Sequence, residues 1–190
     1  MALWYSADSL VLLAGIPGAG KSTLLRRVFR TGSGVRVLDS EQLRERWRPV
    51  LGPVPYGLWR PLLHAVHYLR VLAAIRRGGP LVVHDCATRP WVRRLLGRQA
   101  RRFGLQVHLV LLDVSEEQAR AGQLARGRVV RQRSFATHCR RWRELVAGAR
   151  ECPGRMVPGA RSAIVLDRAA ADRLTGIRFG QRMRAPLLLP

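Results

Sequence analysis

Residues 15–22, which read GIPGAGKS, place three glycines, a lysine and a serine directly after an apolar run over residues 10–14. The run has the length and composition of a strand buried in the centre of a parallel sheet, and a helix is expected over residues 22–30. A strand, a loop of the form G-x-x-x-x-G-K-[ST] and a helix form a cradle in which backbone amides converge on phosphate oxygens. The stretch therefore predicts an α/β fold organised around a phosphate-binding loop.

Lys21 is the only lysine among the 34 basic residues, and the other 33 are arginines. This bias, together with the absence of asparagine, indicates a GC-rich genome. Position 21 is lysine because its compact ammonium group fits beside phosphate oxygens, where the planar guanidinium of an arginine would be too bulky. The Ser22 hydroxyl is expected to bind Mg²⁺. The predicted phosphate-binding residues are Gly15, Pro17, Gly18, Ala19, Gly20, Lys21, Ser22 and Thr23.

Apolar, strand-like runs alternate with helical patterns along the rest of the chain. Strands are predicted at residues 10–14, 35–38, 81–84, 106–112 and 163–166, and helices at 22–30, 40–47, 61–77, 90–103, 115–126, 134–147 and 169–177. This alternation predicts a doubly wound, five-stranded parallel sheet with helices on both faces. We expect one domain over residues 1–180 and a tail at 181–190. The N-terminal residues are interpreted as the first strand and not as a signal peptide.

Two further predictions concern the segment between the second and third of these strands. Residues 48–58 contain three prolines and two glycines, which predicts a loop. The helix over 61–77 is expected to bury one apolar face, formed by Leu62, Ala65, Val66, Leu69, Leu72 and Ala73. Arg60, His64 and His67 would then lie together on the opposite face.

The formal net charge is +22, with only 12 acidic residues, which favours polyanionic partners such as nucleic acid or nucleotides. Codon bias is the alternative explanation, since it accounts for arginine in place of lysine, although not for the shortage of acids. No apolar run reaches the roughly 18 residues that a membrane-spanning helix needs. The three cysteines are odd in number and lack metal-site spacing, so a reducing cytosol and a cytoplasmic location are expected.

Aspartates follow three of the predicted strands, at positions 39, 85 and 113. The carboxyl ends of parallel strands form the edge at which such sheets bind ligands. Asp85 ends an apolar strand of the Walker B kind and is expected near Mg²⁺, with helix capping as the alternative. Asp39 is expected to accept the proton of an attacking hydroxyl, and capping of the next helix is again the alternative. Asp113 is interpreted as structural.

Arg126, Arg128, Arg131 and Arg133 form a basic cluster over residues 126–134, directly after a predicted helix. Guanidinium groups can hold a phosphoryl group as negative charge builds up during its transfer. The cluster is therefore interpreted as an arginine-rich lid, and a solvated basic loop is the alternative.

Three stretches carry a resemblance to a known group. They are AGIPGAGKSTLL at residues 14–25, VLDSEQLRER at 37–46, and the run from LVVHDCATRPWVRRLL at 81–96 to the arginines at 126 and 128. Over residues 10 to about 145 the chain resembles the small P-loop kinases. This group includes polynucleotide 5′-kinases, zeta toxins and gluconate-type kinases, and its members are often labelled AAA-family ATP-binding proteins. The resemblance implies a strand order of 2-3-1-4-5.

The resemblance also implies ATP and Mg²⁺ as cofactors and assigns roles to particular residues. The catalytic residues would be Lys21, Asp39, Arg126 and Arg128, with Asp39 as general base, and Ser22 and Asp85 would lie beside the metal. The residues expected on the acceptor side are Asp39, Arg44, Trp59, Arg60, His64, Asp85 and Arg93. Positions 122–123 read Gly-Gln where many members have Arg-Asn, so position 122 offers no arginine to stack on adenine.

These observations favour a phosphotransferase that moves the γ-phosphate of ATP to a hydroxyl of an acceptor. The acceptor could be a nucleic-acid 5′-hydroxyl, a nucleotide sugar or a small molecule, and the basic composition favours a polyanion. Residues 48–60 match no part of the kinase group, and the aromatic residues in and beside this segment are expected to line the acceptor pocket. The alternative is a regulatory or nucleic-acid-binding ATPase without kinase activity, which would not need a general base at Asp39.

Overall fold

The computed structural model describes residues 1–29, 34–127 and 130–180. Its main sheet has five parallel strands in the spatial order β3-β4-β2-β5-β6. Their bounds are β2 Ser9–Gly15, β3 Arg36–Asp39, β4 Leu81–Asp85, β5 Gln106–Leu112 and β6 Ala160–Leu166. Numbered along the chain as the five predicted strands, the order is 2-3-1-4-5, which confirms the expected topology.

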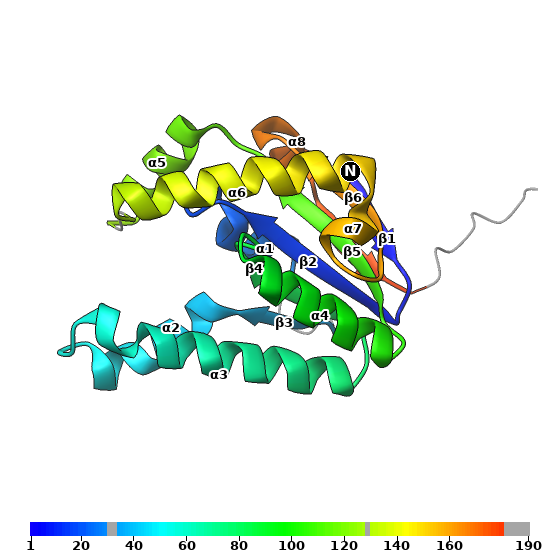
Figure 1. Ribbon diagram of the computed structural model, residues 1–190, viewed down its shortest axis with the longest axis horizontal. Coiled ribbons are helices and arrows are strands. Elements are labelled where there is room, and N and C mark those ends of the chain that lie inside the picture. Colours follow the sequence, from blue (N-terminus) through cyan, green and yellow to red (C-terminus); the bar gives the residue numbers. More distant parts are fainter. Residues whose placement is uncertain (30–33, 128–129, 181–190) are drawn as a thin grey trace, which may run out of the picture.

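Helices cover both faces of this sheet, as the strand–helix alternation predicts. Their bounds are α1 Lys21–Val28, α2 Ser40–Leu51, α3 Tyr56–Arg76, α4 Pro90–Arg102, α5 Glu116–Leu124, α6 Gln132–Glu151, α7 Pro153–Met156 and α8 Arg168–Arg173. Figure 1 shows α4 and α6 crossing in front of the sheet and α1 partly hidden behind it, while α2 and α3 extend along the edge formed by β3. The predicted doubly wound fold is confirmed.

The main core is built on β2, the central strand, in which all seven residues are buried. Because both faces of β2 are covered, its sequence is apolar without the alternation of a half-exposed strand. A second, smaller cluster joins α2 to α3 and consists of Leu43, Trp59 and Leu63. The α2–α3 hairpin therefore has its own apolar support at one end of the molecule.

The segment predicted as a loop at residues 48–58 is mostly helical. α2 continues through Pro49 to Leu51, and α3 begins at Tyr56, so residues 52–55 alone connect the two helices. Pro49 is exposed and lies in the last turn of α2, where the carbonyl that loses its hydrogen bond can be solvated. Burial of Trp59 favours the early start of α3, because packing outweighs the local preference of proline and glycine.

The predicted buried face of the long helix is wrong. Leu62 and Leu69 are 57% and 64% exposed, whereas Leu63, His67, Val71, Ala74 and Ile75 are buried. Most sides of α3 are apolar, so sequence periodicity alone cannot select the face that packs. The contacts of Trp59 and Leu63 with Leu43 of α2 determine the rotation of the helix, and they place His67 on the buried side.

The two ends of the described chain also differ from the prediction. The N-terminal strand, β1 (Ala2–Tyr5), forms a separate two-stranded parallel sheet with β7 (Gly176–Phe179), a strand that the sequence did not suggest. The last helix, predicted to reach residue 177, ends at Arg173. Residues 148–162, between the predicted helix at 134–147 and the predicted strand at 163–166, contain the end of α6, the short helix α7 and the start of β6. The predicted tail at 181–190 lies outside the described residues, and the assignment of one domain to residues 1–180 stays a prediction.

None of the helices within the described residues has both the length and the apolar composition required to cross a membrane.

Candidate active site

The predicted phosphate-binding loop connects β2 to α1. Gly18 and Gly20 have φ values of 92° and 95°, a left-handed backbone that favours glycine. The Lys21 side chain is 6% exposed, and its Nζ donates to the carbonyl oxygens of Gly15 at 2.7 Å and Ile16 at 3.1 Å. The ammonium group is therefore held at the mouth of a loop whose amides start helix α1, as the motif predicts.

The Asp39 carboxylate lies in close contact with the His84 imidazole. The parallel pairing of β3 with β4 sets these residues directly beside each other, and Nδ1 of His84 lies 2.6 Å from Oδ1 of Asp39. The same oxygen accepts a hydrogen bond from the Glu41 amide at 2.8 Å, so Asp39 caps α2 as the alternative interpretation expected. Burial raises the pKa of Asp39, but His84, the Glu41 amide and the charge of Lys21 outweigh it and lower the pKa below its usual value.

Asp85 is engaged at the end of the neighbouring strand β4. Its Oδ2 accepts a hydrogen bond from the Tyr68 hydroxyl at 2.9 Å, and its Oδ1 accepts one from the Ala87 amide at 2.5 Å. Each carboxylate oxygen still has a second lone pair, so Asp85 can also bind a water molecule. The described residues contain no group of three or more His, Cys, Asp or Glu side chains placed to hold a metal ion. A Mg²⁺ ion that binds mainly to phosphates keeps several waters and needs few protein ligands, and the Ser22 hydroxyl and the Asp85 carboxylate are of the oxygen type that it would take.

Arg126, the first residue of the predicted lid, contacts the first turn of α1, where its Nη2 donates to Oγ1 of Thr23 at 3.2 Å. Arg128, the second predicted lid residue, lies outside the described residues. The Gly-Gln pair that replaces Arg-Asn has a clear structural role. A Cβ atom at Gly122 would collide with the Gly18 carbonyl, and Nε2 of Gln123 donates to the Pro17 carbonyl at 3.0 Å. Helix α5 is thus packed directly on the phosphate-binding loop.

Arg168 reaches the same loop from the other side and was missed by sequence reasoning. It is the first residue of α8, directly after the N-cap Asp167, and a Cβ atom built on Gly20 would lie 2.7 Å from its Nη1. No sequence motif marks this position, because only the fold brings residue 168 to residue 20.

The residues predicted on the acceptor side lie in three different parts of the structure. Nε of Arg60 donates to Nε2 of His64 at 3.5 Å, and Asp85 is close enough to influence the pKa of His64. Arg44 and Trp59 instead line a pocket at the α2–α3 connection. Arg93 is 8% exposed and donates to the carbonyls of Ala87 and Met156, so its guanidinium supports the loop after β4.

Several polar residues near the strand ends were not singled out from the sequence for the site. His67 is 1% exposed, its Nε2 has no hydrogen-bond partner within the described residues, and Asp85 and Asp39 both influence its pKa. His138 lies 2.7 Å from the Thr88 hydroxyl, and the Cys86 thiol lies 3.9 Å from Nζ of Lys21. The only sequence signal for Cys86 and His84 was their position next to Asp85.

The fold and site define a P-loop NTPase of the small kinase-like type. The sequence profile of the AAA domain family matches residues 10–151, and the chain belongs to this family. No curated protein is significantly similar to it in sequence.

Solved structures share the fold at low sequence identity. A chain of the PezAT toxin–antitoxin system of Streptococcus pneumoniae is 16% identical, with a TM-score of 0.63 over 96% of this chain and 82% of that one. The tunicamycin resistance protein of Deinococcus radiodurans is 18% identical, with a TM-score of 0.52 over 85% and 87%. Shikimate kinase from Acinetobacter baumannii is 20% identical, with a TM-score of 0.50 over 86% of each chain.

Proposed function

We propose that the protein transfers the γ-phosphate of ATP to a hydroxyl of an acceptor molecule. The observation that carries this proposal is the position of the Asp39 carboxylate, which ends β3, the second strand along the sheet from β2 and its phosphate-binding loop, and which contacts His84. A kinase needs a proton acceptor near the transferred phosphate, whereas a regulatory ATPase does not.

Each residue of the site has a role in this reaction. Lys21 and the loop amides would hold the β- and γ-phosphates, and Ser22 and Asp85 would hold Mg²⁺, which would neutralise phosphate charge. The acceptor oxygen attacks the γ-phosphorus, the bond to the ADP oxygen breaks, and the hydroxyl proton moves to Asp39. Arg126 and Arg128 stabilise the charge on the phosphoryl group during transfer.

His84 positions the base in this proposal. Its imidazole and the Glu41 amide both contact Oδ1 of Asp39, which leaves Oδ2 to accept the proton. The contact also keeps the carboxylate ionised at neutral pH, because it lowers the pKa of Asp39 against the effect of burial.

We also propose that the protein is located in the cytoplasm. The free thiols of Cys86, Cys139 and Cys152 support this location, because a reducing compartment keeps cysteines unpaired.

The decisive experiment is incubation with γ-labelled ATP, Mg²⁺ and a panel of acceptors containing 5′-hydroxyl oligonucleotides, nucleotide sugars, gluconate-like polyols and aminocyclitols. We expect labelling of one acceptor class, and a loss of about 10²- to 10⁴-fold in the Asp39→Asn variant with ATP binding unchanged. Release of labelled phosphate without labelling of any acceptor would instead favour the regulatory ATPase.

A further inference from the structure

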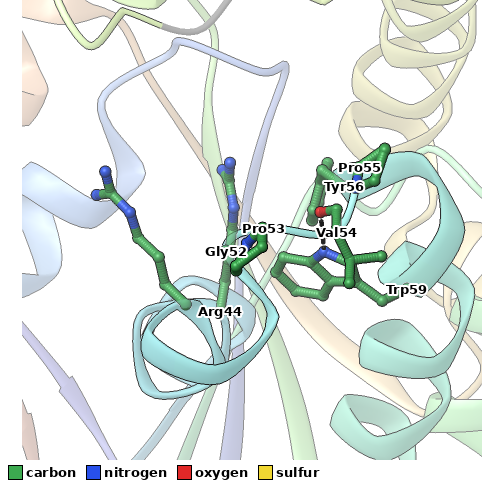
Figure 2. A pocket seen from close by; sticks show the side chains of 8 residues that line it. Arg44, Gly52, Pro53, Val54, Pro55, Tyr56 and Trp59 are labelled. Carbon is green, nitrogen blue, oxygen red and sulfur yellow. Dashed lines mark hydrogen bonds between the residues drawn. The ribbon is translucent and has the colours of Figure 1, made fainter.

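A pocket of about 270 Å³ lies at the connection between α2 and α3. Figure 2 shows Arg44, the connection from Gly52 to Pro55, and the aromatic side chains of Tyr56 and Trp59 around it. Arg48 completes the lining on the α2 side. We refer to this site as the hairpin pocket.

The aromatic wall of the hairpin pocket is held in place by the α2–α3 core. Trp59 is 8% exposed, and its Nε1 donates to the Val54 carbonyl at 3.2 Å, which fixes the connection against α3. The Tyr56 ring lies edge-on to Trp59, with the two centroids 4.8 Å apart. The guanidinium carbon of Arg44 lies 4.3 Å from the centroid of the Tyr56 ring. These contacts arrange the pocket before any ligand binds, which reduces the entropy lost on binding.

The charge of the hairpin pocket is positive. Arg44 and Arg48 are four residues apart on α2, a spacing that places like charges on one face of a helix and destabilises it slightly. No acidic side chain is among the described residues that line the pocket. An anionic group bound between the two guanidiniums would relieve this repulsion, and two arginine forks suit the several oxygens of a phosphate.

The position of the hairpin pocket relates it to the proposed active site. Asp39 is the N-cap of the same helix that carries both arginines. With a rise of about 1.5 Å per residue, Arg44 and Arg48 lie about 7 and about 13 Å along the helix from Asp39. The two arginines are therefore separated from Asp39 by about one and a half and about two and a half turns along α2.

We propose that the hairpin pocket binds a phosphate group carried by the acceptor, so that the substrate is a phosphorylated molecule with its reactive hydroxyl about one and a half to two and a half helical turns away. This proposal rests on the proposed function, because it takes Asp39 as the point at which the hydroxyl is bound. Two sources share the required chemistry, namely the phosphodiester of a nucleic acid and the phosphomonoester of a sugar phosphate.

Binding to protein saturated with ADP tests the proposal, because the phosphate-binding loop is then filled. One pair of probes is the dinucleotide TpT and its uncharged methylphosphonate analogue, and the other is glucose 6-phosphate and glucose. Calorimetry at 0.15 M salt is expected to show that at least one phosphate probe binds about tenfold or more tightly than its uncharged partner. The pair that shows the difference identifies the source.

Variants distinguish the pocket from the general basic surface. Arg44→Gln with Arg48→Gln should abolish the preference for the charged probe, and Arg48→Gln alone should reduce it while leaving the Arg44–Tyr56 contact intact. The double variant Arg46→Gln with Arg76→Gln has the same net charge, changes two exposed arginines outside the pocket, and should retain the preference.

Absence of a charge preference for both pairs, or equal losses in the two double variants, would overturn the proposal. The outcome is separate from the proposed function, since the Asp39→Asn variant should bind the charged probe normally even though it cannot transfer phosphate. Loss of transfer to every acceptor with an intact charge preference would reject the kinase and keep the anion site.

Discussion

Nδ1 of His84 lies 2.6 Å from Oδ1 of Asp39, and both side chains are largely buried at the carboxyl edge of the sheet. The register of β3 with β4 places the two residues side by side, so the contact is fixed by the strand pairing itself. Asp39 uses the same oxygen to cap α2. The carboxylate at the end of β3 is therefore held by contacts with both the neighbouring strand β4 and helix α2.

Replacement of His84 by Gln should shift the pH dependence of phosphotransfer. His84 contributes to the lowered pKa of Asp39, so in the native protein the carboxylate becomes protonated only below the usual aspartate range. Without the imidazole, burial raises this pKa, and the acidic limb of the kcat profile moves to higher pH. We expect kcat at pH 7 to fall by about tenfold, less than for loss of the base itself.

The pH profile separates positioning from a purely structural effect of His84. A fall in kcat with an unchanged acidic limb would mean that His84 only maintains the fold near Asp39. His108→Gln is a suitable control, because His108 lies on β5 and contacts Ser162 on β6, away from Asp39. The His108→Gln variant should leave the pH dependence of kcat unchanged.

Gly122→Ala tests the packing of α5 on the phosphate-binding loop. The added methyl group would collide with the Gly18 carbonyl, so the free energy of unfolding should fall by about 1–3 kcal/mol. Gly57→Ala is the matched control, because a Cβ atom there meets nothing within 4 Å in helix α3. It should be neutral or stabilise by up to about 1 kcal/mol, as measured by urea denaturation. Equal effects of the two substitutions would contradict the close approach of α5.

The phosphate-binding loop was predictable from the sequence because its chemistry lies in eight consecutive residues. The strand order followed from the resemblance, and the structure confirms it. His84 was not recognised as a partner of Asp39, because the two residues are neighbours only through the pairing of β3 with β4. Arg168 is still further from its neighbour Gly20 in the chain, and nothing in its local sequence marks it.

The α2–α3 hairpin shows where local signals fail. Three prolines and two glycines predicted a loop at 48–58, yet burial of Trp59 and Leu63 against Leu43 favours helices on both sides of residues 52–55. The same contacts select the buried face of α3, which a helix with apolar residues on most sides cannot specify through its periodicity. In this hairpin, tertiary packing determines both where the helices begin and end and which face of α3 is buried. Sequence patterns do not reveal that packing.

Two half-buried histidines, His64 and His138, should make the protein less stable at acidic pH. Burial lowers the pKa of His64 and of His138 to about 4 from 6.5. Between these values the unfolded chain binds more protons than the folded protein, so the free energy of unfolding falls as the pH drops from 6.5 towards 4. After a discount for solvent screening, each histidine accounts for about 1–2 kcal/mol of this fall.

Urea denaturation at pH 7, 5.5 and 4.5 measures this effect. His138→Gln keeps a polar group for Thr88 but cannot titrate, so its stability should decline less with acid than that of the native protein. The same slope in both proteins would show that His138 does not contribute to acid sensitivity.

Arg168→Gln should weaken the binding of ATP. The guanidinium lies over Gly20 at the N-terminal end of α1, where the loop binds phosphate, so its loss removes positive charge next to the nucleotide. We expect the KM for ATP to rise by about tenfold and kcat to change by no more than about twofold, because in the proposed reaction Arg168 acts on the nucleotide and not on the acceptor hydroxyl. Arg173→Gln, at an exposed position on the same helix, is the matched control and should leave KM unchanged. A normal KM in the Arg168 variant, or an equal rise in the control, would show that the contact with the loop does not serve nucleotide binding.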